Sequence, residues 1–174
     1  EGDDVIGTLS RYGEQKGLEV VILSGDRDTF QLATDNVRIN IPRTKGGKTE
    51  TEIFNREKVK EVYGIEPKQL IEVKGLQGDT SDNIPGVPGI GEKTALKLLN
   101  QYGTIENLKE HMDELKGKMG EKVRTNIELG LLSKKIATII TDAPVELDLD
   151  AWKYEGQEYN DDLAEFYRRY DMNS

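Results

Sequence analysis

The pattern of hydrophobic and polar positions divides the chain into two parts of different character. Apolar residues recur at helical spacing over about residues 3–16 and predict a helix. The continuous apolar run Leu18–Leu23, with glycines on both sides, predicts a parallel strand buried on both faces. Residues 37–41 alternate and predict another strand, and the turn Lys45–Lys48 predicts a hairpin that returns over Thr49–Ile53. The first part is therefore expected to be α/β.

From residue 55 onward the apolar spacing is helical, and the second part is expected to be all-α. The helices expected there cover residues 55–63, 67–76, 92–101, 104–111, 120–140 and 160–171. We expect an α/β core at residues 1–54 and a helical region at 55–140. A C-terminal segment at 141–174 should carry a helix that packs on the core through its aromatic side chains.

Composition excludes several classes of function. The 174 residues contain no cysteine and a single histidine, His111, which argues against disulfides, zinc or iron–sulfur sites and catalysis by cysteine or a Ser/His pair. No apolar run approaches the roughly 20 residues that span a bilayer, so we expect no membrane role and a cytoplasmic location. The net charge of −9 argues against nucleic-acid binding through overall positive potential, so the distribution of the acids matters more than their sum.

Carboxylates gather in three segments that a fold can bring together. They are Glu1, Asp3 and Asp4 at the start of the first helix, Asp26 and Asp28 after the apolar strand, and Asp79 and Asp82 in a glycine-rich loop. The middle pair follows the carboxyl end of a parallel strand, where open α/β sheets place their ligands. Such a cluster needs cations to offset its repulsion, and all-oxygen ligation selects magnesium or manganese, which can support phosphodiester hydrolysis. The alternative is that these aspartates only cap helices and form turns.

The glycine-rich segment Gly86–Gly91, followed by Glu92–Ala95, resembles a helix-hairpin-helix motif. Its glycine spacing fits neither a dinucleotide fingerprint nor a phosphate-binding P-loop. Glycines at a helix start let backbone N–H groups approach a phosphate, and lysines on the following helix add positive charge. The residues expected to contact DNA are Gly86, Val87, Gly89, Ile90, Gly91, Lys93, Thr94 and Lys97. The alternative is a tight turn between two helices without a ligand.

With these residues in view, the chain resembles the 5′-nuclease domain of bacterial DNA polymerase I, within the flap endonuclease family. Glu1–Val5, Leu23–Asp28 and Gly78–Ala95 carry the resemblance, which extends through nearly the whole chain. It implies a PIN-like, Rossmann-like parallel sheet fragment followed by an all-α helix-hairpin-helix (H3TH) subdomain, with the hairpin at 84–101. It also implies two Mg²⁺ or Mn²⁺ ions and a K⁺ ion at the hairpin. The first divalent site would use Glu1, Asp3 and Asp4, and the second would use the catalytic residues Asp26, Asp28, Asp79 and Asp82.

In that family an N-terminal part with two further strands and a helical arch precedes the segment that begins here at Glu1. We therefore expect missing sheet strands and an incomplete catalytic centre. The expected function is that of a magnesium-dependent, structure-specific 5′-3′ exonuclease or flap endonuclease. It would act as a monomer on duplex and 5′-flap DNA in replication and repair in the bacterial nucleoid, with a polymerase linked to it in the parent protein. The alternatives are a helix-hairpin-helix module that binds duplex DNA without cleaving it, and a scaffold that only docks proteins.

Overall fold

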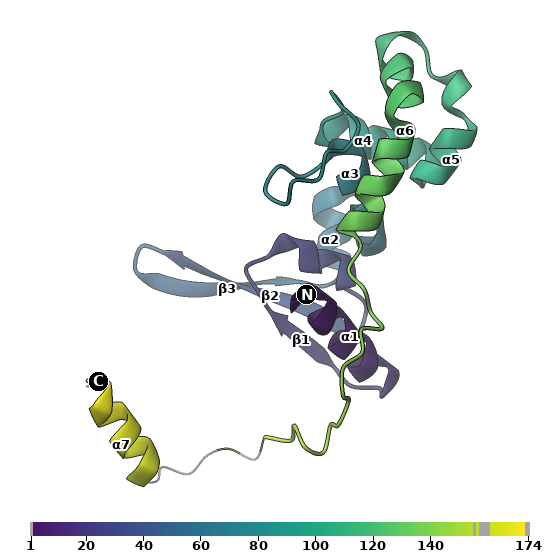
Figure 1. Cartoon of the computed structure of the whole chain (residues 1–174). Helices are drawn as coiled ribbons and strands as arrows, with labels where there is room; N and C mark the ends of the chain where they lie inside the picture. The colour runs from purple at the N-terminus through teal and green to yellow at the C-terminus, as the bar shows by residue number, and fades with distance from the viewer. Residues whose placement is uncertain (1, 155, 157–160, 173–174) are drawn as a thin grey trace.

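The computed structural model describes residues 2–154, 156 and 161–172 of the chain. A small sheet lies at the centre, a group of helices lies on one side of it, and an extended segment leads away to a last helix (Figure 1). The division into an α/β part and an all-α part is the one that the apolar spacing predicted.

The sheet contains β1 (Val20–Leu23), β2 (Val37–Lys45) and β3 (Lys48–Phe54), in that order. β1 runs parallel to β2, with Val20 opposite Val37. β2 and β3 form an antiparallel hairpin that pairs Lys45 with Lys48 at its end. The parallel pair and the hairpin confirm the sequence prediction.

One face of the sheet is covered and the other is open, which corrects the prediction for β1. Helix α1 (Gly2–Gln15) packs on the covered face, and a Cβ atom at Gly13 would lie 2.9 Å from a methyl group of Val20. Ile22 is buried on this face, whereas Val21 and Leu23 are 45% and 72% exposed on the other. The run predicted burial on both faces because Val20–Leu23 are all hydrophobic, but only alternate positions meet a covering layer.

The other regular elements of the described chain are helices. In order they are η1 (Arg27–Leu32), α2 (Arg56–Tyr63), η2 (Pro67–Gln69), α3 (Leu70–Gln77), α4 (Glu92–Tyr102), α5 (Ile105–Glu110), η3 (Met112–Glu114), α6 (Gly117–Ala137) and α7 (Asp161–Arg169), where η marks a 3-10 helix. The helix expected at 120–140 is α6, which ends at Ala137 because Thr138 is extended. Within the part of the chain that the structure describes, no helix is long and apolar enough to cross a bilayer.

The sheet and the helical region each have a hydrophobic core. In the first core, Phe30 stacks on Phe54 with 4.1 Å between ring centroids, and α1 and α2 close the cluster around them. In the second, α3, α4, α5 and α6 surround side chains such as Leu76 and Leu99, which are almost fully buried. Tyr63 and Leu70 pack against both cores. These two residues therefore join the helical region to the sheet.

Helix α7 lies apart from the sheet, whereas the C-terminal segment was expected to pack on the core. Figure 1 shows α7 away from the sheet and from the other helices. Phe166, Tyr167 and Tyr170 are 49%, 42% and 56% exposed, and Phe166 contacts the other two rings within the helix itself. Helical apolar spacing predicts an apolar face, but it does not identify the surface that this face meets.

Candidate metal centre and nucleic-acid interface

Three segments that are distant in the sequence line one hollow where the sheet meets the helical region. They are the first turn of α1, the turn after β1, and the loop between α3 and α4. The hollow has a volume of about 240 Å³, and its lining contains Asp3, Asp4, Asp26, Asp28 and Asp82. Ile84 and residues 136–139 complete the wall. Glu1, which sequence reasoning placed with Asp3 and Asp4, lies outside the described residues.

The loop between α3 and α4 has a fixed shape that places Asp79 and Asp82. Asp79 and Ile84 form an isolated antiparallel bridge, in which each backbone N–H donates to the other residue's carbonyl at 2.8 Å. Asp82 lies in the turn that this bridge closes. Gly86 follows with a φ of +62°, and a Cβ atom there would lie 2.2 Å from the backbone nitrogen of Gly78. Only glycine fits at this close approach.

A tight group of three carboxylates lies at the mouth of this loop. Asp28, Asp79 and Asp82 each offer one carboxylate oxygen, and these oxygens lie within 4.8 Å of one another. Their side chains are 19%, 21% and 52% exposed, so the group is open to solvent on the side of Asp82. Oxygen-only donors at this spacing suit a hard divalent cation such as magnesium or manganese.

Lys74 of α3 lies among these three carboxylates, and sequence reasoning missed it. Its Nζ contacts Asp28 Oδ1 and lies 2.8 Å from Asp79 Oδ2 and 3.7 Å from Asp82 Oδ2. A lysine in the last turn of a helix is ordinarily explained by the negative end of the helix dipole. Nothing in the sequence alone therefore distinguished Lys74 from a surface lysine.

The pKa values in the cluster move in different directions. Burial raises the pKa of Asp28 above its usual 3.8, and the negative charges of Asp26 and Asp82 raise it further. The hydrogen bond and charge of Lys74 lower this pKa but do not outweigh the other effects. The hydrogen bond from Lys74 holds the pKa of Asp79 down to about 2, with a smaller effect from Ser81. Burial works against the charged form of Lys74, but its hydrogen bonds to Asp28 and Asp79 leave its pKa raised. At neutral pH, therefore, the ammonium of Lys74 lies beside an ionised Asp79.

The turn-forming roles proposed as the alternative for these aspartates are also present. Asp26 Oδ1 accepts a hydrogen bond from the backbone of Asp28 at 2.9 Å and caps η1. Asp79 Oδ1 accepts one from the backbone of Ser81 at 2.9 Å, while its Oδ2 faces Lys74. Asp4 Oδ1 accepts one from the backbone of Ile140 at 2.8 Å, which ties α1 to the chain after α6. These aspartates therefore stabilise the local backbone and also lie together at one site.

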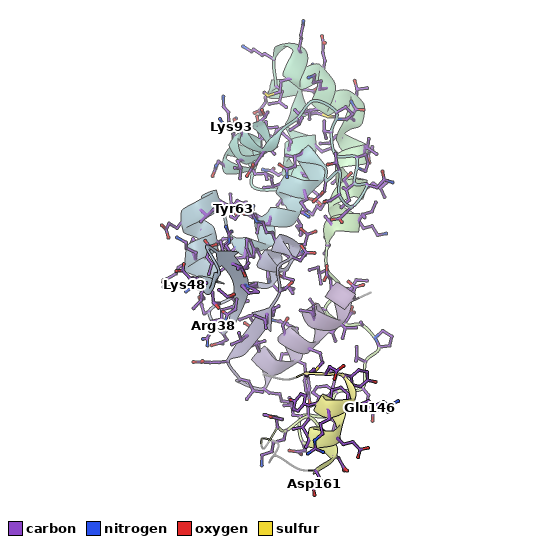
Figure 2. The ribbon with its side chains drawn as sticks, turned by 90° about the vertical axis from the view of Figure 1, so that its left-hand side faces the viewer. Arg38, Lys48, Tyr63, Lys93, Glu146 and Asp161 are labelled. Atoms are coloured by element: carbon purple, nitrogen blue, oxygen red, sulfur yellow. The ribbon has the colours of Figure 1, made fainter. Side chains whose placement is uncertain are left out.

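The predicted DNA-contacting residues divide into a buried set and an exposed set. Gly86 is buried, and the side chains of Val87 and Ile90 are 1% and 4% exposed and belong to the helical core. Gly89, Gly91, Lys93 and Lys97 are exposed, and Thr94 is half-buried. Figure 2 shows Lys93 at the outer side of the helical region. The apolar members of the motif therefore anchor the hairpin, and the glycines and lysines face solvent.

Two residues of α6 support the hairpin and were also missed. The buried hydroxyl of Ser133 accepts a hydrogen bond from the backbone N–H of Gly86 at 3.0 Å. Lys122 Nζ lies 3.4 Å from the carbonyl oxygen of Gly89. The hairpin thus has a third lysine besides Lys93 and Lys97, which follow it in the sequence. Both contacts join residues more than 30 positions apart, so no local sequence pattern could have shown them.

The first turn of α4 has no side chain to cap it. Its N-cap residue is Gly91, which makes no side-chain hydrogen bond to the helix. The first N–H groups of a helix lack partners within the helix and carry a partial positive charge. A helix start of this kind, with glycine before it, is able to bind an anion such as a phosphate oxygen.

Comparison with known proteins gives a consistent set of relatives. The family model described as the 5′-3′ exonuclease N-terminal resolvase-like domain matches residues 1–64, and the model described as the 5′-3′ exonuclease C-terminal SAM fold matches residues 65–160. DNA polymerase I of Bacillus caldotenax is 53% identical over 167 residues, which are 95% of this chain and 19% of that protein. DNA polymerase I of Bacillus subtilis is 50% identical over 157 residues, which are 90% of this chain and 18% of that protein. The chain thus spans about a fifth of the length of these relatives.

Solved structures show the same fold at lower identity. The T5 5′-exonuclease with bound zinc is 24% identical, with a TM-score of 0.69 over 79% of this chain and 49% of that one. The bacteriophage T5 D15 flap endonuclease, in a complex with DNA and metal ions, is 23% identical, with a TM-score of 0.69 over 81% of this chain and 50% of that one. At this identity the likeness establishes the shared architecture of sheet fragment and helical region.

Proposed function

This chain belongs to the 5′-3′ exonuclease family, and from that premise we propose that it forms part of a metal-dependent nuclease that hydrolyses phosphodiesters in DNA with 5′ ends or 5′ flaps. One observation carries the proposal: carboxylates from three distant segments converge beside a glycine hairpin with an uncapped helix start. The related DNA polymerases I and the metal-bound and DNA-bound T5 enzymes support this assignment.

The carboxylates have separate parts in the proposed site. Asp28, Asp79 and Asp82 would hold one divalent ion, because their oxygens already lie within 4.8 Å of one another. Asp3 and Asp4 line the hollow that Asp26 and Asp28 also border, which suits a second ion in the same crevice. Magnesium or manganese, when bound, supplies Lewis acidity toward a phosphodiester. The carboxylates would hold the ions, and the loop between α3 and α4 would place the phosphate beside them.

The hairpin would hold the DNA duplex by its backbone. The amides of Gly89 and Gly91 and the first turn of α4 would offer donors to phosphate oxygens, and Lys93, Lys97 and Lys122 would add charge. A K⁺ ion bound at the hairpin would supply further positive charge toward a phosphate. These interactions contact no base, so we propose that the chain recognises the structure of the DNA, a duplex with a 5′ end or flap, and not its sequence. We also propose that it acts as a monomer.

Replacing both loop aspartates tests the metal assignment. In the double variant Asp79→Asn and Asp82→Asn, Mn²⁺ affinity is expected to fall more than about tenfold, and cleavage of a 5′-flap oligonucleotide in Mn²⁺ to fall at least about 100-fold. Asp113→Asn is the matched control, since Asp113 lies in η3 and belongs neither to the lining of the hollow nor to the group of three carboxylates. Flap cleavage at the wild-type rate by the double variant would refute the assignment.

The same assay separates the enzyme from the binding module. Cleavage of the flap strand by the 174-residue chain supports a nuclease site within it. Retention of duplex DNA at low salt without cleavage supports a helix-hairpin-helix binding module instead. No binding at low salt, where phosphate contacts are strongest, would refute both.

A further inference from the structure

Lys74 places a positive charge where the carboxylates of the proposed metal site converge. Its Nζ contacts Asp28 Oδ1, lies 2.8 Å from Asp79 Oδ2, and lies 3.7 Å from Asp82 Oδ2. The side chain is 16% exposed, so most of its length is enclosed by protein. One ammonium therefore faces all three of the carboxylates that lie within reach of a single ion.

An ammonium and a divalent ion cannot both occupy this place. Magnesium binds its oxygen ligands at about 2.0–2.1 Å, so an ion shared by these carboxylates must lie within the space that Nζ now fills. An ammonium and a divalent ion held by the same carboxylates would also repel each other strongly. The aspartate oxygens that bind Nζ are the ones that would bind the metal.

We propose that Lys74 is a built-in counter-ion of the site formed by Asp28, Asp79 and Asp82, and that a divalent metal binds there by displacing its ammonium. The proposal rests on the proposed function in one respect, that these three carboxylates bind metal. It goes further by assigning Lys74 the task of holding the ligands together without metal and of lowering the metal affinity of the site.

The surroundings of Lys74 allow the side chain to move while its backbone stays in place. Its neighbours Val73 and Gly75 are buried, and a Cβ atom at Gly75 would lie 2.6 Å from Ile105, so α3 is tightly packed. Beside Lys74 is a hollow of about 230 Å³ whose lining includes Tyr63, Gln77 and Glu92. This hollow gives a displaced ammonium both room and polar neighbours, so metal binding requires only a change of side-chain conformation.

Removing the ammonium tests the exchange directly. In Lys74→Gln, Mn²⁺ binding followed by electron paramagnetic resonance is expected to tighten about tenfold or more, because the metal no longer displaces a bound cation. Without metal, the melting temperature of this variant should fall, since three carboxylates then repel one another, and added Mn²⁺ should raise it more than it raises that of the wild type. Lys16→Gln is the matched control, because it removes an equal charge from an exposed position just after the C-terminal end of α1. Unchanged or weaker Mn²⁺ binding in Lys74→Gln would overturn the proposal.

A measurement on the wild-type chain covers the case in which the variant does not fold. With lysine labelled by ¹³C at Cε, the Lys74 signal should shift during a Mg²⁺ titration with the same midpoint as metal binding, while the Lys16 signal stays in place. A Lys74 signal that does not move while Mg²⁺ binds would overturn the counter-ion role but not the metal site. Absence of any Mg²⁺ or Mn²⁺ binding would instead refute the proposed function.

Discussion

Gly86 shows how strictly one position in this structure is determined by its surroundings. Its φ of +62° disfavours any residue with a Cβ atom, and such an atom would meet the backbone of Gly78 at 2.2 Å and of Gln77 at 2.6 Å. Its N–H donates to the buried hydroxyl of Ser133. Because the loop that carries Asp79 ends at this contact, Gly86 supports the carboxylates as well as the hairpin.

Gly86→Ala should therefore destabilise the chain strongly. Left-handed backbone strain and a clash with a rigid neighbouring segment together cost about 2 to 4 kcal/mol. The free energy of unfolding, measured by urea denaturation, checks this value. Gly2→Ala is the control, because no atom lies within 4 Å of its Cβ position, and it should change stability by less than about 1 kcal/mol. Equal stability in the Gly86 variant and the wild type would contradict the steric argument.

A residue of the site could be predicted from the sequence only where its immediate neighbours in the sequence indicate its role. Asp26 and Asp28 follow an apolar strand, and Asp79 and Asp82 lie in a glycine-rich loop, so short stretches of sequence indicated both pairs. Lys74 could not be found in this way, because its role depends on Asp28, which lies 46 positions away in the sequence. The role of a charged side chain depends on the groups that the fold places around it, and these can be distant in the sequence.

At the scale of elements, the junction between α2 and α3 depends on a group of charges around Glu66. Its carboxylate pairs with Arg56 at 2.9 Å and with Lys60 at 2.6 Å, both on α2. Hydrogen bonds from these two side chains lower the pKa of Glu66 from 4.5 to about 2. The ionised carboxylate therefore stabilises the folded chain above pH 4.5, and this contribution is lost as the pH falls through about 2.

Glu66→Gln tests this dependence on pH. At pH 7 the variant should melt at a lower temperature than the wild type, because the amide keeps the shape of the side chain but not its charge. The difference should shrink below pH 4.5 and vanish near pH 2 in a series of thermal melts. Glu57→Gln, on the same helix, controls for the loss of one negative charge. A difference that persisted unchanged to pH 2 would exclude the ion pairs as its cause.

Element types were predictable from the spacing of apolar residues, but the surfaces that they meet were not. Each strand and each long helix of the described chain lies close to its predicted position. The exposed face of β1 and the separate position of α7 were missed for a common reason. A hydrophobic side chain indicates that burial would be favourable at its position. Whether another element covers that position depends on the whole fold.

At the scale of the whole molecule, a net charge of −9 and the DNA binding proposed for the hairpin are compatible only if the charges are separated in space. Acids collect in the hollow around Asp26 and Asp28, and the exposed lysines Lys93 and Lys97 lie on α4. Binding of duplex DNA should therefore be weak and strongly dependent on salt, with the hairpin supplying the attraction.

The salt dependence gives a count of the phosphates that the hairpin contacts. If Lys93, Lys97 and Lys122 each neutralise one, the logarithm of the binding constant should fall with the logarithm of salt concentration at a slope of about −2.7. Lys93→Gln should reduce this slope by about 1, measured by fluorescence anisotropy with a labelled duplex. Lys16→Gln should leave it unchanged, and an unchanged slope in Lys93→Gln would remove this residue from the interface.

The loop between α3 and α4 carries Asp79 and Asp82 at one end and the exposed glycines Gly89 and Gly91 at the other, with the bridge between Asp79 and Ile84 and the close contact at Gly86 between them. The proposed metal ligands and the proposed phosphate-binding glycines therefore lie on one short loop that is held by backbone contacts. In the proposed function, a phosphate bound at these glycines would set which phosphodiester of the strand reaches the carboxylates, so the cleavage position would be measured from the bound nucleotide and would not depend on base sequence.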